Sequence, residues 1–299
     1  MMLDNVLHAA ILATTPILLA ALGGLINRQA GIVNIGLEAM MLSGALAALI
    51  AAHVSGFWAV GLLAAAVAGL ISAAPLSILV TRFGANEIVA GLGLNVLIAG
   101  LIGYLLSDVY GVSGTLRLMP VPTLPRIDLP FIADIPVLGA ILSGKDVLTW
   151  AAWILVPLTA LLLTRTRIGL RLRACGSSPA TANSVGLSVP NLRDGATLAA
   201  GALAGLGGAA LSLGLVGLFS EGLTGGRGFI ALAAFYFGRN RPWPTAFACI
   251  LFGFFDAAQI RLQGGGLPPE LVQVLPYAVV ILALTLASWR RRRGPSPEP

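Results

Sequence analysis

The sequence predicts an all-α integral membrane protein with about eight or nine transmembrane segments, one of them a broken or re-entrant half-helix. Three observations support this fold class. Of the 299 residues, 57% are apolar and only 10% are charged, whereas soluble domains average about 25% charged residues. Several windows of about 20 residues carry little or no charge, which is the length a helix needs to cross the hydrocarbon core. The arginines fall in short stretches between these windows.

Eight windows have the length and apolarity of complete spans. In chain order they are 6–26, 34–54, 57–80, 86–107, 148–164, 195–217, 243–262 and 271–288. Segment 228–238 is apolar but about half the required length, which indicates a half-helix or re-entrant piece. No long polar block interrupts the spans. We therefore expect one transmembrane domain over residues 1–290, followed by a short, proline-rich, disordered cytoplasmic tail over 291–299.

The arginines predict the orientation of these spans, because Lys and Arg are retained on the cytoplasmic side. The segments expected inside are those around Arg28 and Arg82, the island 165–193, residues 239–241 and the tail arginines 290–293. Loop 108–147 has balanced charge and many prolines, which suits the external face. Threading the spans between these anchors requires segment 228–238 to return the chain to the inside. It also places the N-terminus outside.

The sequence lacks the signatures of an enzyme or of a nucleic-acid-binding protein. Segment 139–146 resembles a phosphate-binding P-loop, but it ends in Asp146, where a Ser or Thr hydroxyl should hold Mg²⁺. We read that match as chance, so the chain is not expected to hydrolyse ATP. The two histidines and two cysteines show no metal-binding or catalytic spacing. The net charge of +6 is explained by membrane topology, so we expect no catalytic residue, metal, cofactor or nucleic-acid partner.

Ionisable residues inside predicted spans mark a candidate translocation pathway, because a charge at bilayer depth is costly unless it meets a partner or water. Glu38 and Glu87 lie in the first turns of their predicted helices, where each either offsets the helix dipole or lines the pathway. Asp256 and Gln259 are separated by a helical i,i+3 step and share one face. That pair either faces the pathway or forms a polar clamp between helices.

Three asparagines add neutral hydrogen-bonding groups to the same regions: Asn34, Asn86 and Asn95. An anion pathway should show arginine or lysine inside the spans, and a cation pathway should show several acids. The scarcity of both predicts a neutral, polar, hydroxyl-bearing solute. A glycine-rich turn that precedes the half-helix, with Glu221, Thr224 and Arg227, is expected on the external side, facing an entering ligand or a docking protein, or serving as a plain surface turn.

The basic island 165–193 has a polar centre, and we interpret it as the contact for a cytoplasmic motor protein. Ser178 before Pro179 fits a helix N-cap followed by proline at the first helical position, so a short helix over 178–185 is expected to act as a rigid lever. A bulky residue at Gly176 or Ala180 is expected to abolish coupling without affecting membrane insertion. The candidate coupling residues are Arg171, Arg173, Gly176, Ser178, Pro179, Ala180, Asn183 and Gly186.

Several of these segments together resemble a known family. Residues 28–41 (RQAGIVNIGLEAMM) are similar to the Gly-x-x-Asn-Ile-Gly-Leu-Glu-Gly-Met stretch of permease subunits from nucleoside-type ABC importers, and 86–89 (NEIV) match a further motif. Residues 169–180 resemble the cytoplasmic Gly-x-x-Leu-Arg-Ala-x-Gly-x-Asn-Pro segment. Residues 226–234 and 267–270 match as well, in the family's order. The larger group also serves ribose, other simple sugars and branched-chain amino acids.

This resemblance spans about residues 10–290 and implies the fold of a type II ABC importer permease. It further implies a second, related permease in a heterodimer, cytoplasmic ABC ATPase subunits, an extracytoplasmic solute-binding protein and a bacterial inner-membrane location. Nucleoside is the implied solute and a simple sugar such as ribose is the alternative. Ser178 replaces the family's usual Asn, and Ala39 replaces a Gly. An ion-coupled secondary transporter or a channel is the alternative from another class, and a self-contained transporter would have no reason to carry the basic island.

Overall fold

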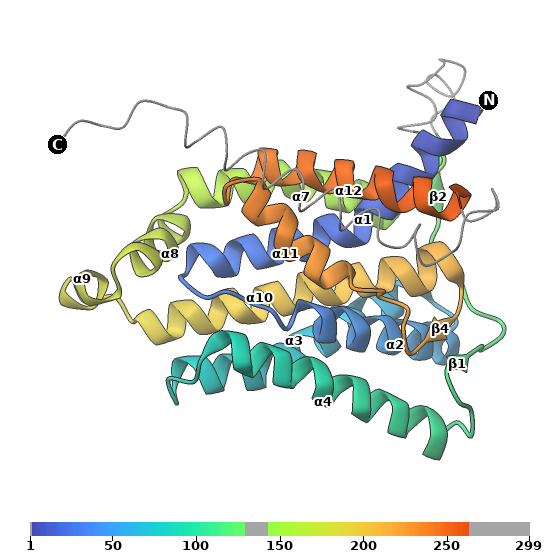
Figure 1. Ribbon diagram of the computed structural model, residues 1–299, viewed down its shortest axis with the longest axis horizontal. Coiled ribbons are helices and arrows are strands. Elements are labelled where there is room, and N and C mark those ends of the chain that lie inside the picture. Colours follow the sequence, from blue (N-terminus) through green and yellow to red (C-terminus); the bar gives the residue numbers. More distant parts are fainter. Residues whose placement is uncertain (1, 129–142, 263–299) are drawn as a thin grey trace.

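Long helices lie side by side along one axis in the computed structural model, which describes residues 2–128 and 143–262 and the side chains of 7–128 and 143–259 (Figure 1). A helix is present at each of the seven predicted spans within these ranges. The eighth predicted span, 271–288, and the tail 291–299 lie outside the described residues. Among the described residues, six stretches are long and apolar enough to cross a membrane: Leu7–Gln29, Leu37–Ser55, Trp58–Thr81, Glu87–Asp108, Val147–Arg165 and Val189–Val216.

The second span begins with a non-helical stretch, called the broken stretch below, so that its helix starts three residues later than the predicted 34–54. Helix α1 (Met2–Gln29) ends in a turn at residues 30–31, and residues 32–35 have no regular structure. Helix α2 (Leu37–Ser55) begins only after this stretch, part-way along the bundle (Figure 1). Two side chains from α4 (Glu87–Asp108) hydrogen-bond the backbone of the broken stretch, as described below, and this replaces the helical hydrogen bonds.

Helices α3 (Trp58–Thr81) and α4 (Glu87–Asp108) follow as an antiparallel pair. The described part of loop 108–147 contains three two-residue strands, which the sequence did not predict. Strand β1 (Thr115–Leu116) pairs with β4 (Phe219–Ser220), and β2 (Arg126–Ile127) pairs with β3 (Lys145–Asp146), both antiparallel. These short ladders close the end of the bundle that carries the N-terminus.

The second half begins with α7 (Val147–Arg165) and two short helices, α8 (Arg167–Ser177) and α9 (Pro179–Ser184). Helix α10 (Val189–Ala209) starts six residues before the predicted 195–217 and continues as a π-helical segment, η1 (Ala210–Val216). Its first turns contain charged residues that are paired within the fold, so hydropathy alone placed the start too late.

Helix α11 (Arg227–Phe237) has 11 residues and is about 16 Å long, roughly half of a hydrocarbon core. This confirms the expected half-helix. Helix α12 (Pro242–Leu262) then runs back along the bundle beside α1 and α11. In this arrangement α11 returns the chain to the end that carries α8 and α9, opposite the N-terminus (Figure 1).

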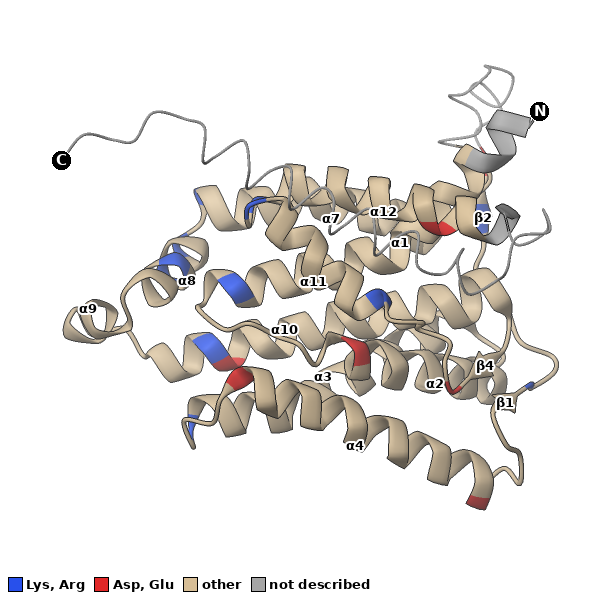
Figure 2. Cartoon of the chain, in the orientation of Figure 1, with Lys and Arg blue, Asp and Glu red and all other residues tan. Residues whose placement is uncertain are grey.

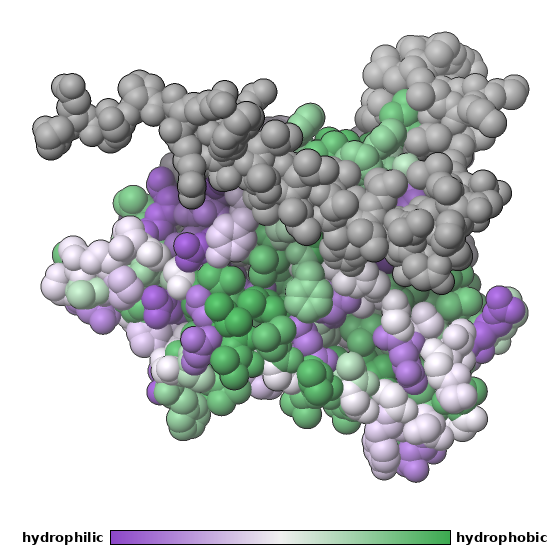
Figure 3. Space-filling view, viewed as in Figure 1, coloured by the Kyte–Doolittle hydropathy of each residue, from purple (hydrophilic) through white to green (hydrophobic). Residues whose placement is uncertain are grey.

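Glycines let α10 pack closely against three helices in the centre of the bundle. A Cβ atom at Gly201 would overlap the backbone of Gly69 on α3, and one at Gly208 would overlap the carbonyl oxygen of Met41 on α2. Such small residues allow close backbone contact in lipid, where no hydrophobic effect drives helices together. The face shown in Figure 3 has apolar side chains across its middle and more hydrophilic ones toward the two ends, as expected of a bilayer-spanning protein.

Candidate functional site

The beginnings of the two broken spans meet inside the bundle and are joined by one carboxylate. Glu38, in the first turn of α2, reaches the start of α11. Its Oε1 accepts a hydrogen bond from the amide of Gly226 at 2.8 Å, and its Oε2 accepts one from the amide of Gly228 at 2.7 Å. A helix N-terminus presents unpaired N–H groups and a partial positive charge. Glu38 therefore caps α11, a partner that neither sequence interpretation of this residue foresaw.

Gly228 makes this junction sterically feasible. An added Cβ would lie 2.5 Å from the amide nitrogen of Glu38 and 2.7 Å from its Cα. Both are backbone atoms, so a side chain could be accommodated only by moving one helix away from the other. Gly226, the N-cap of α11, has φ +79°, a conformation that glycine adopts without steric cost. The glycine-rich sequence before the half-helix thus permits a close helix–helix contact.

Two side chains from α4 hold the broken stretch before α2. Asn95 bridges the break, because its Oδ1 accepts from the amide of Ala39 at 3.0 Å and its Nδ2 donates to the carbonyl of Ile35 at 3.1 Å. Glu87 Oε2 accepts from the amide of Val33 at 2.9 Å. Backbone groups that leave a helix inside a membrane must find other partners, and α4 supplies them.

The other two asparagines have different surroundings. Asn34 lies in the broken stretch and is fully buried; its Nδ2 contacts Met40 Sδ at 3.6 Å, and its Oδ1 has no hydrogen-bond partner among the described residues. Asn86 is the N-cap of α4, where its side chain accepts from the amides of Ile88 and Val89. The sequence had grouped both residues as pathway candidates. The structure places Asn34 in the broken stretch before α2 and gives Asn86 a capping contact.

Arg227 and Asp256 form an ion pair that clamps α11 to α12, with 2.8 Å between Arg227 Nη2 and Asp256 Oδ2. This geometry favours the helix–helix clamp over the pathway-facing alternative for Asp256. Gln259, one turn further along α12, is half-buried. The expectation of an external turn needs correction at two positions. Arg227 is the first residue of α11 and points into the fold, and Thr224 is buried, so only Glu221 remains exposed.

The basic island forms the two short helices at the opposite end from the N-terminus, where arginine positions gather on α8 and its neighbours (Figure 2). Ser178 is the N-cap of α9 and accepts from the amide of Thr181, with Pro179 as the first helical residue, which confirms the expected cap. Ala180, Asn183 and Gly186 are exposed on α9 and the turn after it.

A small separate core fixes α9 to the bundle. Ala182 of α9 packs with Cys175 of α8 and Val189 of α10, and all three are buried. Burial raises the pKa of the Cys175 thiol, with Arg193 opposing the shift. Arg171 and Arg173 are exposed on α8. Helix α9 therefore packs against both α8 and α10.

Gly176 connects this end to the broken span. A Cβ at Gly176 would overlap the carbonyl oxygen of Gln29 and lie 3.1 Å from the amide nitrogen of Gly31. Arg193 of α10 donates from Nε to the carbonyl of Ala30 at 3.2 Å. The turn that opens the broken stretch is thus held by both α8 and α10. A bulky residue at Gly176 would also disturb this packing, whereas one at the exposed Ala180 would not.

A second polar cluster lies near the end of the bundle that carries α8, and the sequence did not predict it. Asp194 of α10 accepts hydrogen bonds from Ser77 and Thr81 of α3 at 2.6 and 2.5 Å, and it pairs with Arg82 at 2.8 Å. From the sequence, Arg82 had been used only to predict which end of the spans is cytoplasmic. A signal was available, because Asp194 is an acid at the end of a basic island and needs a nearby basic partner.

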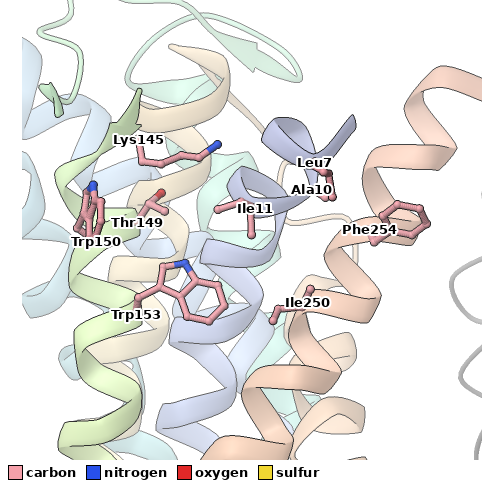
Figure 4. Close-up of a pocket in the computed structure, with 9 residues that line it drawn as sticks. All are labelled: Leu7, Ala10, Ile11, Lys145, Thr149, Trp150, Trp153, Ile250 and Phe254. Atoms are coloured by element: carbon pink, nitrogen blue, oxygen red, sulfur yellow. The ribbon is translucent and has the colours of Figure 1, made fainter. Parts of the chain in front are cut away.

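The cavity in Figure 4 is separate from the junction of α2 and α11. It has a volume of 410 Å³, lies between α1, α7 and α12, and has an apolar wall that includes Trp150 and Trp153. Lys145 stands at one end and contacts His8 Nδ1 at 2.7 Å. Burial lowers the pKa of Lys145 from 10.5 to about 8, although the adjacent Asp146 carboxylate raises it. The described residues that line this cavity include none of the predicted pathway residues.

Comparison with known proteins agrees with this geometry. The family described as "Branched-chain amino acid transport system / permease component" matches residues 6–284. The chain is 32% identical to the guanosine ABC transporter permease protein NupQ of Bacillus subtilis, covering 95% of this chain and 92% of that protein. It is 31% identical to the nucleoside ABC transporter permease protein NupC of Lactococcus lactis, covering 91% and 89%.

An archaeal relative, the putative glucose ABC transporter permease protein TsgC13 of Haloferax volcanii, is 30% identical over 95% of this chain and 91% of its own length. The resemblance seen in the sequence motifs is therefore confirmed over nearly the whole chain. The helical bundle, the two broken spans and the match over residues 6–284 together show that this chain is a membrane permease subunit of the branched-chain amino acid transport system permease family.

Proposed function

We propose that this chain is the permease subunit of a bacterial inner-membrane ABC importer that moves a neutral polar solute, most simply a nucleoside, into the cell. Separate cytoplasmic ATPase subunits supply the energy. The observation that carries the proposal is the junction of α2 and α11, where two broken spans meet inside the bundle around polar groups. Discontinuous helices of this kind form the solute sites of many transporters. Relatives named as guanosine and nucleoside permeases support the solute class.

The electrostatics of the junction support a neutral solute. The N-terminus of α11 attracts anions in principle, but the Glu38 carboxylate already occupies it. The Arg227 guanidinium is likewise matched by Asp256. A charged solute would meet no uncompensated opposite charge at this junction. Hydroxyl and amide groups of a nucleoside or sugar can instead exchange hydrogen bonds with Asn34, Asn95 and backbone groups of the broken stretch.

The contacts at the basic end support a route for coupling. An ATPase that grips the exposed face of α9 moves α8 and α10 through the core of Ala182 and Cys175. Gly176 and Arg193 then shift the turn at residues 30–31, which opens the broken stretch that leads to Glu38. Each step is a packed contact or hydrogen bond between described residues. Of the coupling residues named from the sequence, Gly176 thereby has a physical connection to the candidate pathway.

The proposal includes three kinds of partner: ABC ATPase subunits at α9, an external solute-binding protein, and a second permease. The α4 surface suits the second permease, because only 17% of its apolar window is buried in this chain. Gly93 and Gly100 on α4 have no neighbouring atoms within 4 Å of an added Cβ, and such open glycines allow close helix contact. The same relatives support a heterodimer, since both nucleoside and guanosine systems include two named permeases.

A sugar is the second candidate solute, because one relative is named as a putative glucose permease and another as a glucose permease. Competition experiments separate the candidates. The chain is co-reconstituted with its ATPase, its second permease and its binding protein, and uptake of labelled guanosine is measured with ATP. We expect unlabelled nucleosides to compete, and glucose, ribose and leucine to have no effect. If only a sugar competes, the solute is a sugar and not a nucleoside, and the chain is still an importer permease.

A further inference from the structure

A second polar pocket lies at the end of the bundle that carries α8, apart from the junction of α2 and α11. It has a volume of 630 Å³ and lies between the last turns of α7, the end of α1 and the turn that joins α11 to α12. The described residues that line it include Arg173, Arg239 and Arg241 and no aspartate or glutamate. The N-terminus of α12, which begins at Pro242, adds a partial positive charge. Among the described residues, the lining of this pocket is therefore positively charged.

The backbone conformation of the α11–α12 turn is unusual in the same place. Arg239 and Asn240 are consecutive non-glycine residues with φ of 54° and 55°. Left-handed backbone is uncommon for arginine, and such outliers gather at functional sites. The turn is fixed by a hydrogen bond from Gln29 Nε2 to the carbonyl of Asn240 at 2.8 Å. The fold thus maintains a strained turn that brings two arginines to one pocket.

An apolar surface extends from this pocket along the bundle. Trp243 and Phe247, one turn apart on α12, are 61% and 66% exposed, and Leu161 on α7 is 55% exposed. Residues at i and i+4 share one helix face, so the two aromatic side chains form a continuous strip. Tryptophan is enriched at the headgroup level of membranes. The pocket therefore combines a basic site at headgroup depth with an apolar surface directed toward the bilayer core.

We propose that this pocket binds the phosphate of an anionic phospholipid, with the headgroup among the three arginines and the acyl chains along Trp243 and Phe247. Basic pockets between transmembrane helices on the cytoplasmic side suit such headgroups. A lipid explains both the charge and the apolar strip, whereas an acidic surface of the ATPase explains only the charge. The proposal depends on the cytoplasmic orientation of this end and is independent of the transported solute.

The test compares two double variants of the full chain in nanodiscs. Arg239→Asn with Arg241→Gln removes two pocket charges, and asparagine tolerates the left-handed backbone at position 239. Arg173 is left unchanged because it belongs to the proposed ATPase-coupling segment. The matched control is Arg165→Gln with Arg167→Gln, which removes two exposed charges from the same end, outside the pocket lining. Size-exclusion profiles verify that each variant is folded.

Phosphatidylglycerol is titrated into phosphatidylcholine nanodiscs, and bound lipid is counted by native mass spectrometry. Each basic residue near a membrane contributes about fivefold to anionic-lipid affinity, so the pocket variant should bind phosphatidylglycerol about 30-fold more weakly. The control should match the wild type. Equal lipid affinity for wild type and pocket variant overturns the proposal, including the case in which the pocket variant instead loses ATPase binding. Stabilisation of the wild type by inorganic phosphate to the same extent as by phosphatidylglycerol also overturns it, in favour of a free-anion site.

Discussion

The most informative perturbation of the junction is Glu38→Gln, because it replaces one carboxylate oxygen with an NH₂ group and leaves the side-chain volume almost unchanged. The carboxylate accepts the amides of Gly226 and Gly228 with its two oxygens. Glutamine keeps one accepting oxygen and replaces the other with an NH₂ group, which can only donate. One amide at the start of α11 then faces another donor, and the negative charge that offset the helix dipole is lost.

The magnitude follows from these changes. A hydrogen bond to a charged group contributes about 1.5–3 kcal/mol, and a buried donor left without an acceptor costs about 1–3 kcal/mol. Glu38 is only half-buried, so water moderates part of this loss. We expect the variant to lose about 2–4 kcal/mol of unfolding free energy. Uptake through the assembled importer should fall together with stability, because the two broken spans lose their connection.

The matched control is Glu87→Gln. The carboxylate of Glu87 accepts a single amide, that of Val33, and glutamine retains an oxygen for it. The expected loss is about 1 kcal/mol or less. Both variants are unfolded by denaturant titration in detergent micelles, with tryptophan fluorescence as the signal. Equal losses for the two variants would refute the assignment of Glu38 as a two-point cap on α11.

Four further outcomes are expected. Gly228→Ala should destabilise the fold by more than about 2 kcal/mol, because its Cβ overlaps the backbone of Glu38. Gly93→Ala places its Cβ in open space and should stabilise α4 by about 0.5–1 kcal/mol. Thermal unfolding of the two variants measures both effects. If α4 contacts a second permease, Gly93→Ala should also weaken the co-purification of that subunit. Arg227→Met should cost about 3–5 kcal/mol by leaving Asp256 unpaired, and adding Asp256→Asn should restore part of it in a double-mutant cycle. Stability should rise with pH between about 8 and 10.5, since Lys145 is deprotonated there when folded but still protonated when unfolded; Lys145→Met should remove that rise.

The sequence predicted the membrane class, most of the spans and the half-helix, because length and apolarity are properties of each segment by itself. The cap at Ser178 was predicted for the same reason, since its partner lies three residues away. The break before α2 was missed. Its backbone is held by Glu87 and Asn95, which are more than 50 residues distant in sequence. The apolarity of the segment itself does not depend on those contacts and could not predict them.

The contact partners of the charged residues could not be predicted from the local sequence pattern either. The sequence singled out Glu38, Arg227 and Asp256 as polar residues that need an explanation inside a membrane, and each one proves to have a specific contact. Which groups they contact depends on how α11 returns into the bundle, and therefore on tertiary packing. The same applies to Gly176, whose closeness to Gln29 becomes visible only when α8 is placed against α1.

We propose that this permease has no energy source of its own and is moved by an ATPase that binds at α9. The most direct measurement compares solute accumulation in two sets of proteoliposomes that differ only in their subunits. With the ATPase, second permease and binding protein present, accumulation should require ATP and should be lost when Ala180 is replaced by tryptophan, although that variant still inserts and folds. Accumulation driven by an ion gradient in vesicles that contain this chain alone would contradict the account.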